Sequence, residues 1–383
     1  MYRVLFFCNE SYSLFPGGEE GPRFGGAELQ LYTIADEISK NESFEVTWLF
    51  TDSKKYNVSS LSHPRMNILE RKPPFGRNVP ILSRYFNRKR FIRKKTLLEP
   101  YRSYSPDVII STMGYLAEDL KVEAGLTGAK TVFRVASDAD VNGVRVAFSK
   151  RPEQILRDIA SFDSVVVATD EQKTNLRKVR KGPIVKIAKF TKMSTDAPST
   201  PNPKSILWVA SCQEIKQPQL FLSLAKNFPS EHFVMIMPPI DKKLGQAVSA
   251  EAAGIPNLEL IYEQVPREKV AEYFASAKLF VNTSSVEGFP NTFLEACSVG
   301  IPILSYAFNP DDMINVHGIG LCANDSWSGL VEQCTVLLSD KSLLEEKGRN
   351  ARVYFEQNHN LEKIVQDWTS LIASVVDDDN RPE

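Results

Sequence analysis

Two carboxylates, Glu287 and Glu295, flank a run of small residues that interrupts an apolar segment. Residues 278–281 are typical of a short strand, which Gly288 and Pro290 cannot continue. We therefore expect Glu287 in a strand-to-helix loop and Glu295 one turn inside the helix that follows. This spacing predicts two acids that face the same crevice.

The start of that helix is predicted to bind phosphate. The backbone N–H groups of Asn291, Thr292 and Phe293 would have no partner within the helix and would lie at the positive end of its dipole. A carboxylate is a good acceptor for sugar hydroxyls. Two acids beside a phosphate site suggest a nucleotide sugar, with one acid for the ribose and one for the transferred hexose.

A structural alternative exists for the same residues. Residues 292–295 fit a capping box, in which Glu295 would bond to the start of its own helix, and Glu287 would then be a solvated loop acid. The two acids and the Gly-Phe-Pro-Asn-Thr between them, however, resemble the E-x7-E signature of the retaining glycosyltransferase family 4, also called glycosyl transferases group 1. That resemblance favours donor binding and extends it to Gly288 and Phe289.

Composition limits the possible functions. The 46 basic and 47 acidic residues give a net charge of -1, so nothing in the overall charge attracts nucleic acid or anionic membrane. Five scattered cysteines without a C-x-x-C pair indicate neither a disulfide framework nor a zinc site. The first apolar run is too short for a signal peptide and no run approaches 18 residues. We expect a cytoplasmic protein with no nucleic-acid partner.

Apolar runs alternate with helical stretches along the chain, which predicts an α/β fold with doubly wound parallel sheets. In the first half strands are expected at residues 3–8, 44–50, 107–111, 131–135, 164–168 and 184–187, and in the second half at 206–210, 233–237, 258–261, 279–282, 301–305 and 319–322. The proline-rich stretch 194–203 is the expected linker.

The 383 residues suit two domains. We place an acceptor-binding domain at 1–200, a nucleotide-sugar-binding domain at 201–360, and a last helix with a frayed acidic tail at 361–383. Two such Rossmann-like sheets, with a last helix returning to the first domain, resemble the GT-B fold, in which the domains face a central cleft.

The glycine-rich turn after the first strand is a second candidate site. Residues Gly25-Gly26-Ala27-Glu28 resemble the turn that opens the first helix in family 4, where the backbone approaches the donor phosphates and the acceptor. Alternatively, the glycines only permit a tight bend. No G-x-G-x-x-G follows the first strand of either half, which argues against an NAD-binding dehydrogenase.

Lys216 is a candidate phosphate ligand. It lies just before a predicted helix that has Pro218 in its first turn. The helix dipole disfavours a cation there, so Lys216 is either solvated or faces an anion that is absent from the sequence. The resemblance implies that Lys216 binds the diphosphate, together with an Arg five residues earlier. Ser211 stands there instead, which predicts weaker donor binding or compensation by another base.

Many family 4 members also carry a His after the fourth strand, and here Ser137-Asp138-Ala139-Asp140 occupies that region. Asp138 or Ser137 is expected to orient the acceptor or bond to the hexose, with Arg134 steadying the acid. Alternatively, these groups finish a strand and cap the next helix. Asp138 and Asp140 also form a D-x-D, the metal motif of the other glycosyltransferase fold. The E-x7-E and two-sheet patterns oppose that fold, so we expect no metal.

The strongest local charge bias lies at residues 71–95, which contain ten Lys or Arg and no acid. Apolar residues recur among them at roughly helical spacing. The stretch is either a solvated face or a peripheral contact with anionic membrane or a lipid-linked diphosphate.

Taken together, the resemblance implies a retaining, metal-independent glycosyltransferase that moves a hexose from a nucleoside diphosphate sugar to a saccharide or lipid-linked acceptor in polysaccharide or glycoconjugate synthesis, without a further cofactor. Lys216 would stabilise the leaving diphosphate, Glu287 would hold the hexose, and Glu295 the ribose. One alternative is an inert GT-B module that binds a sugar or a partner, suggested by Ser211 and the missing His. Another is a glycoside hydrolase, which a phosphate site argues against.

Overall fold

The computed structural model describes residues 1–8, 11–18, 25–51, 58–71, 104–112, 121, 124–125, 127–142, 152–191 and 204–377. The chain forms two compact units. Met1–Ile187 and Leu361–Glu383 form the first, called the N-unit here, and Ala188–Asn360 form the second, called the C-unit. The predicted linker 194–203 and all of the basic stretch 71–95 except Arg71 lie outside the described residues.

The N-unit is built on a parallel sheet of seven strands in the order β3-β2-β1-β4-β5-β6-β7. Its central strands are apolar and buried because helices cover both faces. The strands are β1 (Tyr2–Phe7), β2 (Phe44–Thr51), β3 (Asn67–Arg71), β4 (Val108–Ser111), β5 (Lys130–Arg134), β6 (Ser164–Val167) and β7 (Ile184–Lys186). All were expected except the edge strand β3.

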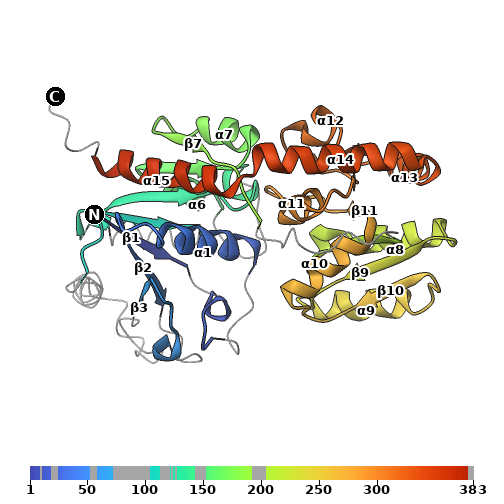
Figure 1. Ribbon diagram of the computed structural model, residues 1–383, viewed down its shortest axis with the longest axis horizontal. Helices are drawn as coiled ribbons and strands as arrows, with labels where there is room; N and C mark the ends of the chain where they lie inside the picture. Colours follow the sequence, from blue (N-terminus) through green and yellow to red (C-terminus); the bar gives the residue numbers. More distant parts are fainter. Residues whose placement is uncertain are drawn as a thin grey trace. The chain divides into compact units, whose positions relative to one another are not determined.

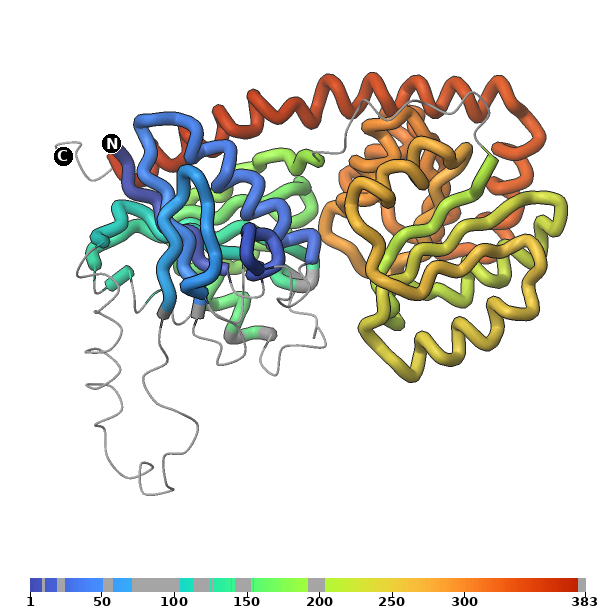
Figure 2. The backbone as a smooth tube through the Cα atoms, turned by 60° about the horizontal axis from the view of Figure 1, so that its bottom comes forward, coloured from blue at the N-terminus to red at the C-terminus, as the bar shows by residue number. Residues whose placement is uncertain are grey.

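Helices from both ends of the chain pack on this sheet. The apolar face of α1 (Gly26–Ile38) includes Leu31, Ile34 and Ile38, all buried. The last helix, α15 (Leu361–Asp377), contacts both α1 and β4. Asp377 at its end accepts a hydrogen bond from the hydroxyl of Tyr2 at 2.8 Å, so the start of β1 and the end of α15 lie together (Figure 2). The remaining N-unit helices are α5 (Ala139–Asn142), α6 (Pro152–Ile159) and α7 (Asp170–Arg177).

The C-unit repeats the plan with six parallel strands in the order β10-β9-β8-β11-β12-β13. Of these strands, β9, β10 and β11 are labelled in Figure 1. Its strands, all expected, are β8 (Ser205–Val209), β9 (His232–Ile236), β10 (Leu258–Ile261), β11 (Ala277–Asn282), β12 (Ile303–Ser305) and β13 (Gly320–Cys322). Its helices are α8 (Pro218–Asn227), α9 (Lys242–Ala252), α10 (Arg267–Ser276), α11 (Asn291–Ser298), α12 (Met313–Val316), α13 (Trp327–Ser339) and α14 (Lys341–Asn358). The predicted α/β class with two doubly wound sheets is confirmed.

Both sheets have one point where the strand order reverses. In the N-unit that point lies between β1 and β4, and in the C-unit between β8 and β11. Connections leave neighbouring strands in opposite directions there, and ligands of open α/β sheets bind in the resulting crevice, outside the carboxyl ends of the strands. The loops after β8 and β11 lie at this point in the C-unit and are therefore candidates for a binding site.

No helix in the described part of the chain is long and apolar enough to cross a membrane.

Candidate functional site

The loop after β8 and the loop after β11 are joined by hydrogen bonds at the strand-order reversal of the C-unit. The N–H of Ser285 donates to the carbonyl of Ile215 at 2.9 Å. Thr283 donates from Oγ1 to the carbonyl of Lys216 at 2.7 Å and accepts from the buried indole of Trp208 at 2.8 Å. Because all these groups are paired, the two loops form one structure, and Lys216 is fixed by its backbone against the loop after β11.

Lys216 and Glu287, which are 71 residues apart in sequence, form an ion pair in this structure. Lys216 Nζ lies 2.5 Å from Glu287 Oε1, and each side chain is 15% exposed. Ser284 Oγ donates to the same carboxylate oxygen at 2.6 Å. Lys216 is therefore paired rather than solvated, and the anion that it faces here is Glu287. Its binding of a diphosphate stays a prediction.

The backbone places Lys216 at the edge of the site. It ends a short 3₁₀ helix, and Gln217 turns the chain with a positive φ of 47° before Pro218 begins α8. That left-handed conformation is unusual for a residue other than Gly, Asn or Asp. The turn is therefore a constrained feature that sets where Lys216 leaves the backbone.

Helix α11 begins at Asn291, directly after Pro290, and no side chain caps it. Thr292 is thus the second helical residue rather than the cap, so the capping-box interpretation of Glu295 is wrong. The N–H of Phe293 bonds to the carbonyl of Pro290 at 3.2 Å and is not left for a phosphate as expected.

Glu295 lies in the second turn of α11 with 12% of its side chain exposed, and its nearest charge is Arg267. Arg267 Nη2 is 3.5 Å from Glu295 Oε1 and also donates to Thr191 Oγ1 at 3.0 Å. Burial raises the pKa of Glu295, and the guanidinium of Arg267 partly opposes that rise. Sequence reasoning missed Arg267, because one Arg at the start of a helix carries no signal of its own.

A second group missed from the sequence holds the loop after Glu287. Lys189, itself buried, donates from Nζ to the carbonyl of Phe289 at 2.7 Å. The carbonyl of Lys189 lies 2.6 Å from His359 Nδ1, and since a carbonyl only accepts, His359 carries its proton there. His359 Nε2 then accepts from the hydroxyl of Tyr354 at 3.1 Å. Burial lowers the pKa of His359 to about 4, consistent with this neutral ring.

The other predicted donor residues lie close to these groups. Gly288 is buried, and the buried ring of Phe289 has its centre 5.5 Å from that of His359. Ser211 lies in the loop after β8, where its Oγ accepts from Gln213 Nε2 at 2.8 Å. Ser211 supplies no positive charge, so the described cations nearest the two acids are Lys216 and Arg267.

The remaining predicted residues belong to the N-unit. The N–H of Gly25 donates to Glu28 Oε2 at 2.9 Å, and Gly26 begins α1. The Gly25 amide is therefore bonded within the protein rather than left for a phosphate.

Asp138 is buried, and its Oδ1 accepts from Gln172 Nε2 at 2.8 Å. Asp140 Oδ2 accepts from the N–H groups of Ala136 and Ser137 at 3.0 and 2.9 Å. The expected contact of Arg134 with Asp138 is wrong, because no such bond exists between these two described residues. Within the described ranges, no three His, Cys, Asp or Glu side chains are grouped as metal ligands.

Comparison with known proteins gives a family match within the C-unit. Residues 191–354 match the family described as Glycosyl transferases group 1, which agrees with the resemblance over that part of the chain. N-acetyl-alpha-D-glucosaminyl L-malate synthase of Bacillus anthracis is 29% identical over 115 residues, or 30% of each chain. An uncharacterized glycosyltransferase of Haemophilus influenzae is 24% identical over 112 residues, covering 28% of this chain and 31% of that one. These matches thus span less than a third of either relative.

Solved structures resemble the whole chain. Sucrose-phosphate synthase from Thermosynechococcus elongatus has a TM-score of 0.75 at 16% identity, covering 98% of this chain and 99% of that one. A TarM mutant of S. aureus with UDP has a TM-score of 0.74 at 13% identity, covering 97% and 100%. Anabaena HepE with UDP-glucose has a TM-score of 0.73 at 13% identity, covering 98% of this chain and 100% of that one. These likenesses show that the fold is GT-B.

Proposed function

We propose that the protein is a retaining, metal-independent glycosyltransferase that moves a hexose from a nucleoside diphosphate sugar to a saccharide or lipid-linked acceptor. The observation that carries this proposal is the Lys216–Glu287 pair at the strand-order reversal of the C-unit. Lys216 can bind phosphate and Glu287 can bind sugar hydroxyls. The two residues come from the adjacent loops after β8 and β11, at the edge where α/β sheets bind ligands. The group 1 match over 191–354 supports the same assignment.

Donor binding then uses groups already held in place. The diphosphate takes the place of Glu287 on Lys216, and the N–H groups of Asn291 and Thr292 face it with the positive end of the α11 dipole. Glu295 holds the ribose hydroxyls, and Arg267 orients the Glu295 carboxylate and partly opposes the rise in its pKa that burial causes. Arg267 is the base that compensates for Ser211.

The chemistry is leaving-group stabilisation. As the bond from the sugar carbon to the diphosphate oxygen breaks, negative charge grows on that oxygen, and Lys216 stabilises it in a partly buried setting. The released Glu287 accepts hydrogen bonds from the hexose. The acceptor hydroxyl attacks the same face of the sugar and passes its proton to the departing phosphate. No protein nucleophile and no metal or other cofactor takes part.

The names of similar proteins support this substrate class. HepE was solved with UDP-glucose, and the TarM mutant with UDP and a saccharide. We propose that the N-unit binds the acceptor, with Asp138 among its contacts, in cytoplasmic polysaccharide or glycoconjugate synthesis. The basic composition of 71–95 supports contact with anionic membrane, for which liposome sedimentation should rise with anionic lipid and fall with salt.

The test is a thermal-shift panel of nucleoside diphosphates and their sugars, followed by turnover. We expect one nucleotide series to stabilise the wild type, and its sugar to be consumed in EDTA with release of the diphosphate. Lys216→Met should remove most of the diphosphate response. If the donor binds tightly but is never turned over across a broad acceptor panel, the inert binding module replaces the enzyme. Activity lost in EDTA and restored by manganese would contradict the metal-independent mechanism.

A further inference from the structure

Arg134, the last residue of β5, is buried without a partner for its charge. Only 4% of the residue is exposed, and Nη1 is fully buried with no acceptor. Within the described chain, no carboxylate, carbonyl or hydroxyl accepts a hydrogen bond from its guanidinium. Burial lowers the pKa of Arg134 to about 10, so the group remains charged at neutral pH.

Arg180, in the same unit, shows what a structural buried arginine looks like. It is 5% exposed, and its guanidinium donates to the carbonyls of Ala160, Phe162, Asp163 and Pro183 at 2.5–3.1 Å. Those bonds tie the end of α6 to the segment before β7. Two arginines with nearly equal burial thus differ in one respect, because Arg180 is satisfied by the fold and Arg134 is not.

The acids nearest to Arg134 in sequence are committed elsewhere. Asp138 faces Gln172, and Asp140 accepts from two backbone N–H groups of its own turn. The Arg134 backbone is also fixed, because its carbonyl accepts from Thr112 Oγ1 at 2.9 Å. The fold therefore fixes the backbone of Arg134, and no residue that the structure describes supplies an anion for its charge.

A buried charge without a partner destabilises a protein strongly, so its presence requires an explanation. Arg134 ends a strand adjacent to β4, at the carboxyl edge of the sheet and one strand from its order reversal. Ligands of α/β sheets bind at this edge. The planar guanidinium fork matches the two oxygens of a carboxylate or phosphate.

We propose that Arg134 binds an anionic group of the acceptor, a phosphate or a carboxylate. This inference rests on the proposed transferase function and assigns the acceptor a charge. The oxyanion replaces the missing partner, so the N-unit selects charged acceptors over neutral saccharides of the same shape.

The experiment measures melting temperatures of the full chain with inorganic phosphate and, separately, malonate. Because Lys216 is also a phosphate ligand, all variants are made on a Lys216→Met background that removes the donor-site response. Arg134→Met keeps the length of the side chain and removes its charge. Arg180→Met is the matched control, with the same substitution at the same burial in the same unit.

Without anion we expect Arg134→Met to melt no lower than its background, because removing an unpaired buried charge is neutral or stabilising. Arg180→Met should melt lower, because it leaves four carbonyls without a donor. With anion, the background protein should be stabilised and Arg134→Met should bind at least about tenfold more weakly, while Arg180→Met responds as the background does. A response to phosphate alone indicates a phosphorylated acceptor, and one to malonate alone a carboxylate.

The proposal is overturned if neither anion stabilises the background protein, if Arg134→Met responds normally, or if it melts as low as Arg180→Met without anion. Calorimetry with the nucleoside diphosphate distinguishes failure of the Arg134 proposal from failure of the transferase proposal. Arg134→Met, made on the wild-type chain, should bind that nucleotide as the wild type does. A wild type that binds no nucleotide contradicts the donor site, whereas the anion response reports on Arg134 alone.

Discussion

Replacement of Glu287 by Gln tests whether Lys216 exchanges partners during donor binding. The ammonium of Lys216 is 2.5 Å from Glu287 Oε1, and a diphosphate bound to Lys216 as proposed would displace that carboxylate. Gln keeps the shape and an acceptor for Lys216 and Ser284 but removes the negative charge. Nucleoside diphosphate should therefore bind more tightly, although a residue of the proposed site has been altered.

The size of the effect follows from the bond that is weakened. Lys216 bonds to a second charge in the wild type and to an uncharged amide in Glu287→Gln. Both bonds are charge-assisted, but the amide lacks the attraction between opposite charges, so we expect it to compete with the diphosphate less well by about 1 kcal/mol. Both side chains are mostly buried, which limits screening by solvent. A gain of about 1 kcal/mol corresponds to roughly five- to tenfold lower Kd.

Turnover should change in the opposite direction. Glu287 is proposed to hold the hexose in the transition state, and an interaction of about 3 kcal/mol made mainly there lowers kcat and kcat/KM together by about 10²-fold. Tighter product binding with slower chemistry is an unusual combination. General damage to the site would instead weaken both.

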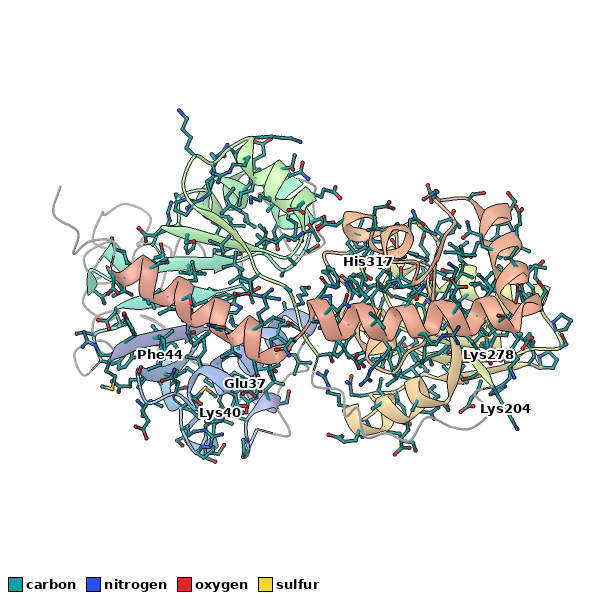
Figure 3. The ribbon with its side chains drawn as sticks, turned by 45° about the horizontal axis from the view of Figure 1, so that its top comes forward. Glu37, Lys40, Phe44, Lys204, Lys278 and His317 are labelled. Atoms are coloured by element: carbon teal, nitrogen blue, oxygen red, sulfur yellow. The ribbon has the colours of Figure 1, made fainter. Side chains whose placement is uncertain are left out.

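The assay is calorimetry with the best nucleoside diphosphate, paired with steady-state turnover of its sugar. The control is Glu231→Gln, which breaks the Lys278–Glu231 ion pair in the same unit. Lys278 lies near Lys204 at the opposite, amino-terminal edge of the sheet (Figure 3), so this change should alter neither Kd nor kcat. If Glu287→Gln binds the diphosphate as the wild type does, or more weakly, Lys216 does not exchange partners.

Three further predictions concern charge and pH. Lys216→Met should weaken diphosphate binding by at least about tenfold and nucleoside binding little, and equal losses in calorimetry would exclude a phosphate contact. Burial raises the pKa of Glu295, so the protonated carboxyl stabilises the folded state below pH 4.5, and this stabilisation is lost as the pH rises. Glu295→Gln should therefore have a higher melting temperature than the wild type at pH 7, and the difference should shrink as the pH is lowered. Burial lowers the pKa of His359 from 6.5 to about 4, so the folded state should lose about 3 kcal/mol as pH falls through that window. Urea titrations across this range should show a flatter profile for His359→Gln, and an unchanged slope would contradict the buried neutral ring.

The strands were predictable because burial on both faces requires continuous apolar runs, as in β1 and β11. The exception is β3, whose residues 67–71 include polar and charged side chains at the edge of the sheet. A half-exposed edge strand has no such run and leaves little signal. The last helix was expected from the resemblance to the GT-B fold, and α15 buries Ile364, Trp368 and Ile372.

The location of the site was predictable, but its pairings were not. The turn from β11 into α11 follows from Gly288 and Pro290, which cannot extend a strand. The ion pair of Lys216 with Glu287 depends on β8 and β11 being neighbours in the sheet, which no local pattern encodes. The capping-box alternative failed because Pro290 takes the position before the helix and moves Glu295 into its second turn.

The loop that carries Glu287 is fixed on both sides while Glu287 itself is held by polar contacts that a ligand can replace. On one side Ser285 bonds to the backbone of Ile215, and on the other Lys189 bonds to the carbonyl of Phe289. Backbone anchors of this kind keep the loop in place when the carboxylate changes partner. Because Lys216 is anchored through its own carbonyl by Thr283, both members of the pair can release each other without movement of the main chain. If the donor binds as proposed, binding would require only side-chain rotation, and a preorganised loop of this kind would lose little conformational entropy.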